Sequence, residues 1–372
     1  MMMTGGMNMY TEIVKIIEGG IIGDKEKVYN YAQVLAVNLE KSGDTALAKK
    51  ISSLLTNKKV RMASLDEFSI KPVDTESRMD MVDIFIPDTN FENPILKPYI
   101  EEEIENFINS YQQRDEILRA GIEMISSLLL YGPPGCGKTT VAKYISYKTG
   151  LPLITVRLDG LVSSLLGSTA KNIRRTFEYA SRRDCILFLD EFDVVAKLRD
   201  DKHELGELKR VVNSLLQNID SFSQNSILIA ATNHQELLDP AVWRRFTKII
   251  TLEKPNKEEI VLMIKSLIKN SNSNVVENEK KLEQVALAYE GISHADVKTV
   301  FNNAIKKSII NKKDSTNSWD MLQEVYLYKN HKINSESDFL KFLMQYGVTQ
   351  KEISENLNYS LRKVREISKI VD

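Results

Sequence analysis

The chain has 372 residues, of which 42% are hydrophobic and 27% are charged, and its formal net charge is −1. These values are typical of a globular protein with room for two or three domains, and they argue against a protein that coats nucleic acid or membranes through a generally basic surface. The two cysteines, Cys136 and Cys185, are too few for a disulfide framework. No apolar run reaches the length of a membrane span and no signal peptide is visible, so the sequence predicts a cytoplasmic protein without membrane contact.

The N-terminal part is predicted to be helical. Between about residues 10 and 55, apolar residues recur at helical spacing in three stretches that Gly19-Gly20, Gly23 and Gly43 separate. This pattern predicts a helical hairpin or a three-helix module, whose polar faces are either solvated surface or a docking site. Residues 57–88 are polar and include two prolines, which is typical of a linker. We therefore assign residues 1–75 to a helical module with its linker.

The central part has the pattern of an α/β domain. After a helical segment at residues 100–118, short apolar segments alternate with helices, and we expect strands at 128–131, 152–158, 185–189, 226–231 and 248–252. Near-continuous apolar strands that alternate with helices predict a parallel sheet with helices on both faces. We place this α/β domain at residues 76–253.

The loop after the first of these strands is a complete phosphate-binding motif. Its sequence GPPGCGKT matches G-x-x-x-x-G-K-[ST], a pattern in which backbone N–H groups surround the phosphates of a nucleotide. Lys138 would contact the β- and γ-phosphates, and the hydroxyl of Thr139 would reach Mg²⁺. The predicted cofactors are therefore ATP and Mg²⁺. The residues expected to bind the nucleotide are Gly132, Pro133, Pro134, Gly135, Cys136, Gly137, Lys138, Thr139 and Thr140.

Polar residues follow two further strands at the edge where α/β sheets bind ligands. Asp190 and Glu191 come directly after the strand at 185–189, and Asn233 follows the strand at 226–231. We expect Asp190 to support Mg²⁺ and Glu191 to act as the base that polarises the attacking water. Asn233 would lie beside the γ-phosphate and help to position this water.

Two adjacent arginines, Arg244 and Arg245, lie in a predicted turn within the stretch LDPAVWRRF. A guanidinium group is suited to stabilise the charge on a phosphoryl group that is being transferred. The alternative is a surface pair that is bonded to nearby carboxylates.

In this order, GPPGCGKTT, CILFLDEFD, ILIAATN, LDPAVWRRF and GISHADV closely resemble the motifs of AAA ATPases. More narrowly, they resemble the central clade with its protein-unfolding and complex-disassembling motors, over about residues 95–310. The resemblance implies a P-loop NTPase fold followed by a small all-α lid, here at residues 254–312. It also implies ATP bound between the subunits of a ring, usually a hexamer, with Arg245, or alternatively Arg244, reaching the ATP of the neighbouring subunit.

The chain departs from the family pattern at two places. The family commonly spaces its arginines as R-x-G-R-F-D-R, whereas this chain has the shorter RRFTK, which leaves open which arginine is the finger. The stretch 161–168 matches the central-pore loop of the family, so that Leu165, Leu166 and Gly167 would contact a threaded polypeptide. Leu165 stands where an aromatic residue is usual and offers less contact area. Residues 199–204 form either a second pore-facing loop or a solvated loop.

The C-terminal residues 313–372 are predicted to be a helical tail. Apolar spacing in residues 347–367 indicates a helix-turn-helix-like pair, whose second helix carries Arg362, Lys363 and Arg365. Residues 312–372 nevertheless hold ten basic and nine acidic residues, so packing on a partner competes with DNA binding as an interpretation.

The predicted function is an ATP-driven motor that assembles into a homo-oligomeric ring and remodels or unfolds a protein or protein complex. The alternative is an ATP-gated, DNA-associated regulator that controls a partner effector. The sequence has no H-E-x-x-H and no Cys/His cluster with metal-binding spacing. Any effector chemistry such as proteolysis would therefore belong to a partner.

Overall fold

The structure is a computed structural model. It describes residues 5–22, 25–42, 44–52, 71–73, 80–87, 91–122, 124, 126–157, 166–193, 205–222, 226–238, 240–269, 278–313 and 315–369. The chain divides into two compact units, residues 1–73 with 78–80 and residues 74–77 with 81–372.

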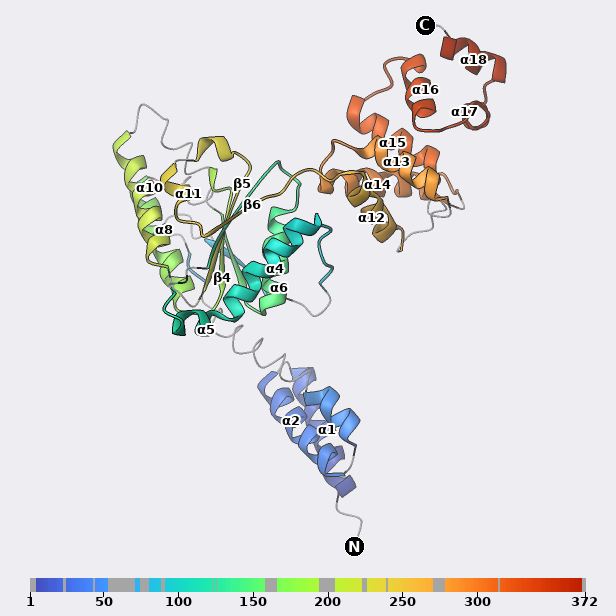
Figure 1. Cartoon of the computed structure of the whole chain (residues 1–372). Helices are drawn as coiled ribbons and strands as arrows, with labels where there is room; N and C mark the ends of the chain where they lie inside the picture. The colour runs from blue at the N-terminus through green and yellow to red at the C-terminus, as the bar shows by residue number, and fades with distance from the viewer. Residues whose placement is uncertain are drawn as a thin grey trace. The chain divides into compact units, whose positions relative to one another are not determined.

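The first unit contains paired helices where the sequence predicts them. Helices α1 (Gly5–Ile22) and α2 (Lys25–Ser42) pack against each other, and residues 45–52 are also helical (Figure 1). Between the two long helices, the amide of Asn38 donates a hydrogen bond of 3.0 Å to the buried carboxylate of Glu12. A buried polar contact of this kind helps to fix the register of two apolar helix faces.

The second unit is built around a six-stranded sheet with the order β1-β3-β4-β5-β2-β6 among the described residues. Strands β2 to β6 run parallel, and β1 is antiparallel to β3 at the edge. The strands are β1 (Val82–Phe85), β2 (Ser127–Tyr131), β3 (Leu153–Arg157), β4 (Ile186–Asp190), β5 (Ile227–Thr232) and β6 (Lys248–Thr251). The sequence predicted the parallel strands to within a residue or two. It did not predict β1, which lies in the polar stretch that was interpreted as a linker.

Helices cover both faces of this sheet, as the sequence predicted. Helices α4 (Pro98–Gln112) and α6 (Lys138–Thr149) lie on one side, and α8 (Leu166–Ser181) and α10 (Leu205–Asp220) lie on the other (Figure 1). Alternate residues of the central strands, such as Leu128 and Leu130, join α4 and α6 in one hydrophobic core. The short elements α5 (Arg114–Arg119), η1 (Gln235–Leu237) and α11 (Pro240–Trp243) connect the larger ones.

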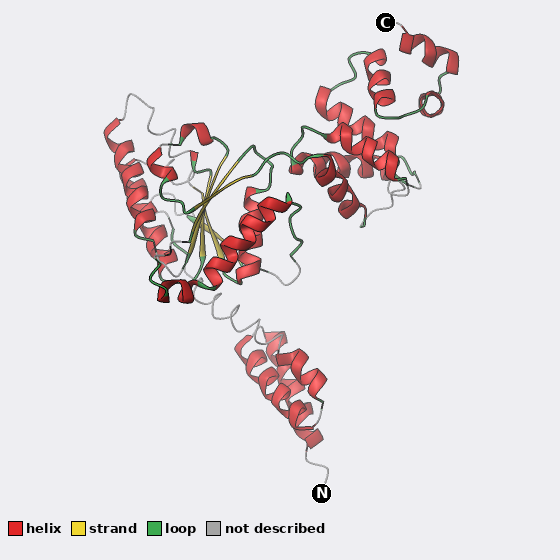
Figure 2. Cartoon of the chain, in the orientation of Figure 1, coloured by secondary structure: helices red, strands yellow, loops and turns green. Residues whose placement is uncertain are grey.

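After β6, the described residues of the second unit form helices that are joined by loops (Figure 2). A single hydrophobic core runs from Ile260 to Val364, so that the predicted lid and the predicted tail share buried side chains. The domain boundary between residues 312 and 313 stays a prediction. The helices are α12 (Lys257–Ile268), α13 (Glu279–Tyr289), α14 (His294–Ile310), α15 (Ser318–Asn330), α16 (Glu336–Gln345), α17 (Gln350–Leu357) and α18 (Leu361–Lys369). None of the described helices has the length and apolar character needed to cross a membrane.

Candidate ATP-binding site

The predicted phosphate loop connects β2 to α6 by a turn that requires glycine. Gly132, Gly135 and Gly137 have φ angles of 146°, 75° and 93°, which side-chain-bearing residues rarely adopt. At Gly132 a Cβ atom would also lie 1.9 Å from the carbonyl oxygen of Leu252. Helix α6 begins at Lys138, directly after Gly137. Its free N–H groups and its dipole therefore point toward the loop, as an anion site requires.

Lys138 is held against the backbone of this loop. Its Nζ donates hydrogen bonds of 2.7 Å to the carbonyl oxygen of Gly132 and 2.9 Å to that of Pro133, and the residue is only 8% exposed. Burial lowers the pKa of Lys138, while the negative charges of Asp190 and Asp193 act in the opposite direction. A phosphate group that approaches the loop would complete the solvation of this buried cation.

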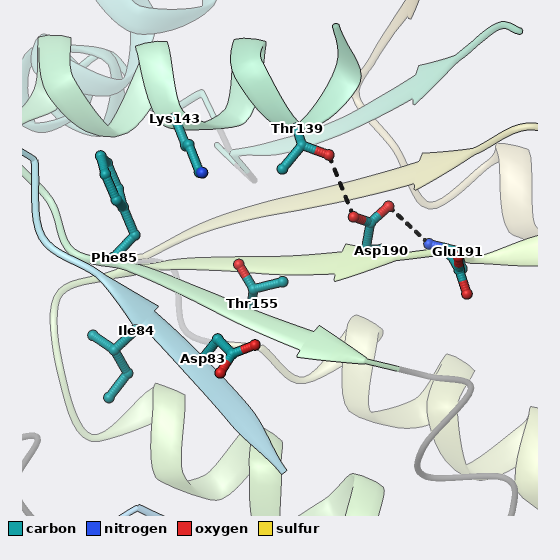
Figure 3. A pocket seen from close by; sticks show the side chains of 8 residues that line it. All are labelled: Asp83, Ile84, Phe85, Thr139, Lys143, Thr155, Asp190 and Glu191. Carbon is teal, nitrogen blue, oxygen red and sulfur yellow. Dashed lines mark hydrogen bonds between the residues drawn. The ribbon is translucent and has the colours of Figure 1, made fainter. Parts of the chain in front are cut away.

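Asp190 lies at the end of β4, within hydrogen-bond distance of the start of α6. The hydroxyl of Thr139 donates to its carboxylate at 3.3 Å, and the backbone N–H of Glu191 donates to the other oxygen at 3.0 Å (Figure 3). A hydroxyl and a carboxylate side by side are the oxygen ligands that Mg²⁺ prefers. The two residues predicted to be metal ligands thus fit the ion, and this role stays a prediction.

Glu191 has an unusual backbone conformation, with a φ of 54°. The following residue, Phe192, is buried and donates its N–H to the carbonyl oxygen of Ala231 at 2.8 Å, which anchors the turn against β5. Left-handed conformations of residues other than glycine cost free energy and cluster at functional sites. The side chain of Glu191 is exposed, next to Asp190.

Two cavities meet at these acids. The larger, of about 570 Å³, is bounded by the phosphate loop, both acids and Asn233, and by residues of α12 and α14. The smaller, of about 460 Å³, is bounded by residues of β1 and β3 and by Lys143 of α6 (Figure 3). Thr139, Asp190 and Glu191 line both. The predicted residues from Pro134 to Thr140, Asp190, Glu191 and Asn233 are therefore brought together around one space.

The larger cavity also has walls that the sequence interpretation did not assign. They come from residues 92–96, which precede α4, from Met263, Ser266 and Leu267 of α12, and from His294, Ala295 and Lys298 of α14. The stretch GISHADV was recognised only as a family motif, and nothing local in it indicated which side chains face a ligand.

Helix α14 begins directly on the phosphate loop. The backbone N–H of Ala295 donates to the carbonyl oxygen of Gly135 at 3.0 Å, and a Cβ atom on Gly135 would lie 2.4 Å from the hydroxyl of Ser293. Ser293 and Asp296 form a reciprocal capping box at this helix start. The predicted phosphate loop and the helical segment are therefore in direct contact.

The two arginines lie apart from both cavities. Arg245 forms a two-point ion pair with Asp220 at the end of α10, with N···O distances of 2.7 and 2.9 Å, and donates to the carbonyl oxygen of Ala241 at 2.6 Å. Arg244 is exposed. Neither arginine lines the cavities found among the described residues.

Most of the predicted pore loop lies outside the described residues. Leu165 and residues 199–204 lie outside the described residues, and only the backbone of Leu166 and Gly167 is described, as the first residues of α8. Over the described residues, no group of three or more His, Cys, Asp or Glu side chains is arranged to hold a metal ion.

The predicted helix pair of the tail is present as α17 and α18. Its basic side chains contact groups of the same chain: Arg362 bonds Glu366, Arg365 bonds Gln350, and Lys363 lies over the ring of Tyr359. DNA binding through this pair stays a prediction.

Comparisons with known proteins define the class. The model of the family "ATPase family associated with various cellular activities (AAA)" matches residues 128–254. An uncharacterised AAA family ATPase, y4kL of Sinorhizobium fredii, is 39% identical over 245 residues, which are 66% of this chain and 73% of that protein. The chain therefore belongs to the AAA family of ATPases, and ATP hydrolysis is its activity.

Other relatives match over a smaller part of their length. Proteasome-activating nucleotidase 1 of Haloferax volcanii is 31% identical over 270 residues, which are 68% of this chain and 65% of that protein. A proteasome-activating nucleotidase of Methanococcus maripaludis is 32% identical over 62% of this chain and 57% of its own length. The crystal structure of the FIGL-1 AAA domain has the same fold, with a TM-score of 0.56 at 18% identity over 76% of this chain and 96% of that one.

Proposed function

We propose that this ATPase assembles into a homo-oligomeric ring, with six subunits as in the usual arrangement of the family it resembles, and uses ATP hydrolysis to remodel or unfold a protein or protein complex. The observation that carries the proposal is the place of Arg245. This residue is the strongest candidate for stabilising the transferring phosphoryl group, yet its guanidinium is bonded to Asp220 outside both cavities. A site that receives this group from the neighbouring subunit resolves the contradiction.

Within one subunit, the remaining roles follow from chemistry and position. Lys138 binds the β- and γ-phosphates, and Thr139 with Asp190 holds Mg²⁺, which neutralises phosphate charge when bound. Glu191 accepts the proton of the attacking water, and Asn233, which also lines the larger cavity, orients this water. Arg245 of the next subunit stabilises the charge on the transferring group, and Arg244 is the alternative for this role.

The proposal of a protein substrate rests on similarity. Relatives named proteasome-activating nucleotidases match more than half of this chain, and the stretch around Leu165, Leu166 and Gly167 resembles a substrate-gripping pore loop. A leucine at position 165 can insert between the side chains of a threaded chain with less contact area than an aromatic ring.

Mixing two inactive variants tests the shared site. Lys138→Ala and Arg245→Ala subunits are each expected to lose ATPase activity, because one lacks the phosphate clamp and the other lacks the group given to its neighbour. In rings assembled at random from equal amounts of the two variants, about a quarter of the interfaces would combine an intact Lys138 with an intact Arg245, and activity would return in that proportion. Arg244→Ala in place of Arg245→Ala decides between the two arginines.

The size of the assembly is measured alongside, by light scattering with and without ATP. The expected result is a ring-sized particle that recovers activity on mixing. Absence of recovery together with a monomeric mass would contradict the proposal.

A further inference from the structure

One histidine in the wall of the larger cavity lacks the hydrogen bonds that a buried polar group requires. His294 is the first residue of α14, and both of its ring nitrogens are shielded from solvent and have no hydrogen-bond partner among the described residues. Buried polar groups in native proteins are almost always paired, because an unpaired one loses its water without compensation. A side chain of this kind in the wall of a ligand cavity is suited to contact the ligand.

The cavity that His294 lines has walls that suit the organic part of a nucleotide. With the phosphates at the loop, the ribose and base have the remainder of the cavity, where Leu96, Met263 and Leu267 provide apolar walls. Sites for flat, drug-sized ligands combine such walls with a few polar groups that set specificity. His294 is a polar side chain with spare hydrogen-bonding capacity in this wall.

The position and charge of His294 are also defined. The next residue, Ala295, is tied to the phosphate loop through its 3.0 Å hydrogen bond to Gly135. Burial, and secondarily the positive charge of Lys97, lowers the pKa of His294 and so favours the neutral form of the ring. A neutral imidazole offers one donor and one acceptor, as the edge of a purine base does.

We infer that His294 is a specificity-determining residue that hydrogen-bonds the purine base of the bound nucleotide, with a small rotation of the ring bringing a nitrogen to the base. The inference rests on the assignment of this cavity to the nucleotide, and it does not require a ring or a protein substrate.

The test is competition binding against a fluorescent ADP, which separates recognition from turnover. The competitors are ADP, 7-deaza-ADP, purine riboside diphosphate without the 6-amino group, and 2′-deoxy-ADP. The wild-type protein is expected to bind at least one of the two base-modified analogues about ten-fold more weakly than ADP. His294→Phe, which keeps an aromatic wall but removes both nitrogens, is expected to bind that analogue and ADP equally.

Two further variants make the result specific. His294→Gln keeps a donor and an acceptor and is expected to retain part of the discrimination between bases. Thr299→Ala changes an exposed residue of the same helix that does not line the cavity, and it is expected to behave as the wild type. The ratio of 2′-deoxy-ADP to ADP affinity is expected to be the same in all variants.

Unchanged base discrimination in His294→Phe, or a change confined to 2′-deoxy-ADP, would overturn the inference, as would a wild-type protein that does not discriminate. If none of the nucleotides bound, the assignment of the larger cavity to a nucleotide would itself be wrong. Discrimination that depends on His294 in a protein that forms no ring would support the inference and contradict the proposed function.

Discussion

The larger cavity is lined by the phosphate loop, here called its phosphate end, and by residues of α12 and α14, here called its helical end. The two ends differ in how their polar groups are held. At the phosphate end, Lys138 and Thr139 are bonded to protein atoms, and the loop is fixed by glycine conformations and by the strand below it. At the helical end, His294 has no hydrogen-bond partner among the described residues. The phosphate end is therefore preorganised by its own backbone, whereas we expect a ligand to complete the hydrogen bonding of His294 at the helical end.

The difference follows from the two hydrophobic cores. The phosphate loop connects β2 and α6, which share one hydrophobic core. Helices α12 and α14 belong to the other core, which continues into the tail. The contact between Ala295 and Gly135 joins them beside the cavity. A nucleotide that fills the cavity touches both cores and adds contacts between them, so its binding is expected to stabilise the helical segment together with the tail.

Glu191→Gln tests the phosphate end and has the largest expected effect. The amide keeps the size of the side chain but cannot accept a proton, so kcat is expected to fall by about 10²- to 10³-fold. ADP and ATP affinities are expected to stay within about two-fold, since Glu191 is not assigned a binding role. Steady-state hydrolysis and equilibrium binding measure the two effects, and Glu101→Gln, at an exposed position of α4, is the matched control. Normal turnover by Glu191→Gln would show that Glu191 is not the base that accepts the proton of the attacking water.

Gly135→Ala tests the contact between the two ends. Its φ of 75° disfavours alanine by about 1–2 kcal/mol, and the added Cβ would crowd Ser293 and Ala295 as well. Gly150→Ala is the matched control, because its φ is 74° and no atom lies within 4 Å of its added Cβ. Both variants are expected to lose thermal stability. Only Gly135→Ala is expected to weaken ADP binding, by about ten-fold or more, and equal affinities in the two variants would show that crowding against α14 does not matter.

The same contrast explains what the sequence could predict. The phosphate end was predictable because its chemistry depends on residues that are close in the chain, such as the glycines, Lys138 and Thr139, and on acids that end apolar strands. The strand β1 was missed because it is four residues long, contains Asp83 and pairs antiparallel with β3, a partner some 70 residues later. Edge pairing of this kind leaves no periodic signal in so short a segment.

The helical end was not predictable for a different reason. His294 was identified only as part of the family motif GISHADV, since its position in a cavity wall depends on where α14 docks on the phosphate loop. The shared core of lid and tail likewise depends on a cluster of buried side chains that extends along the chain from Ile260 to Val364. Local spacing predicted the helices of both segments but not that they pack into one core.

Asp220→Asn tests whether the ion pair positions Arg245. The amide removes the charge that holds both nitrogens of the guanidinium, so kcat is expected to fall about ten-fold with ATP affinity unchanged. The control is Glu178→Gln, which breaks the exposed pair with Arg174 on α8. Equal kcat values in the two variants would mean that Arg245 reaches its working position without Asp220.

Ser293→Ala has the smallest expected effect, and it tests whether the start of α14 influences nucleotide binding. It removes the cap of α14, which is expected to cost about 1 kcal/mol of stability. Thr349→Ala removes an equivalent capping box from α17 at similar cost, but no residue of α17 lines the described cavities at the phosphate loop. Thermal unfolding is therefore expected to shift similarly in both variants, whereas ADP affinity falls only in Ser293→Ala.

Combining Ser293→Ala with Gly135→Ala then separates capping from crowding. The Ser293 hydroxyl, which would lie 2.4 Å from the Cβ added at position 135, is absent in the double variant. Gly135→Ala is therefore expected to cost less ADP affinity in the Ser293→Ala background than in the wild-type protein. Additive losses would mean that the backbone strain at Gly135, rather than the crowding of α14 against the loop, limits nucleotide binding. In that case the helical end would act on the phosphate end only through the ligand, and His294 would carry that influence.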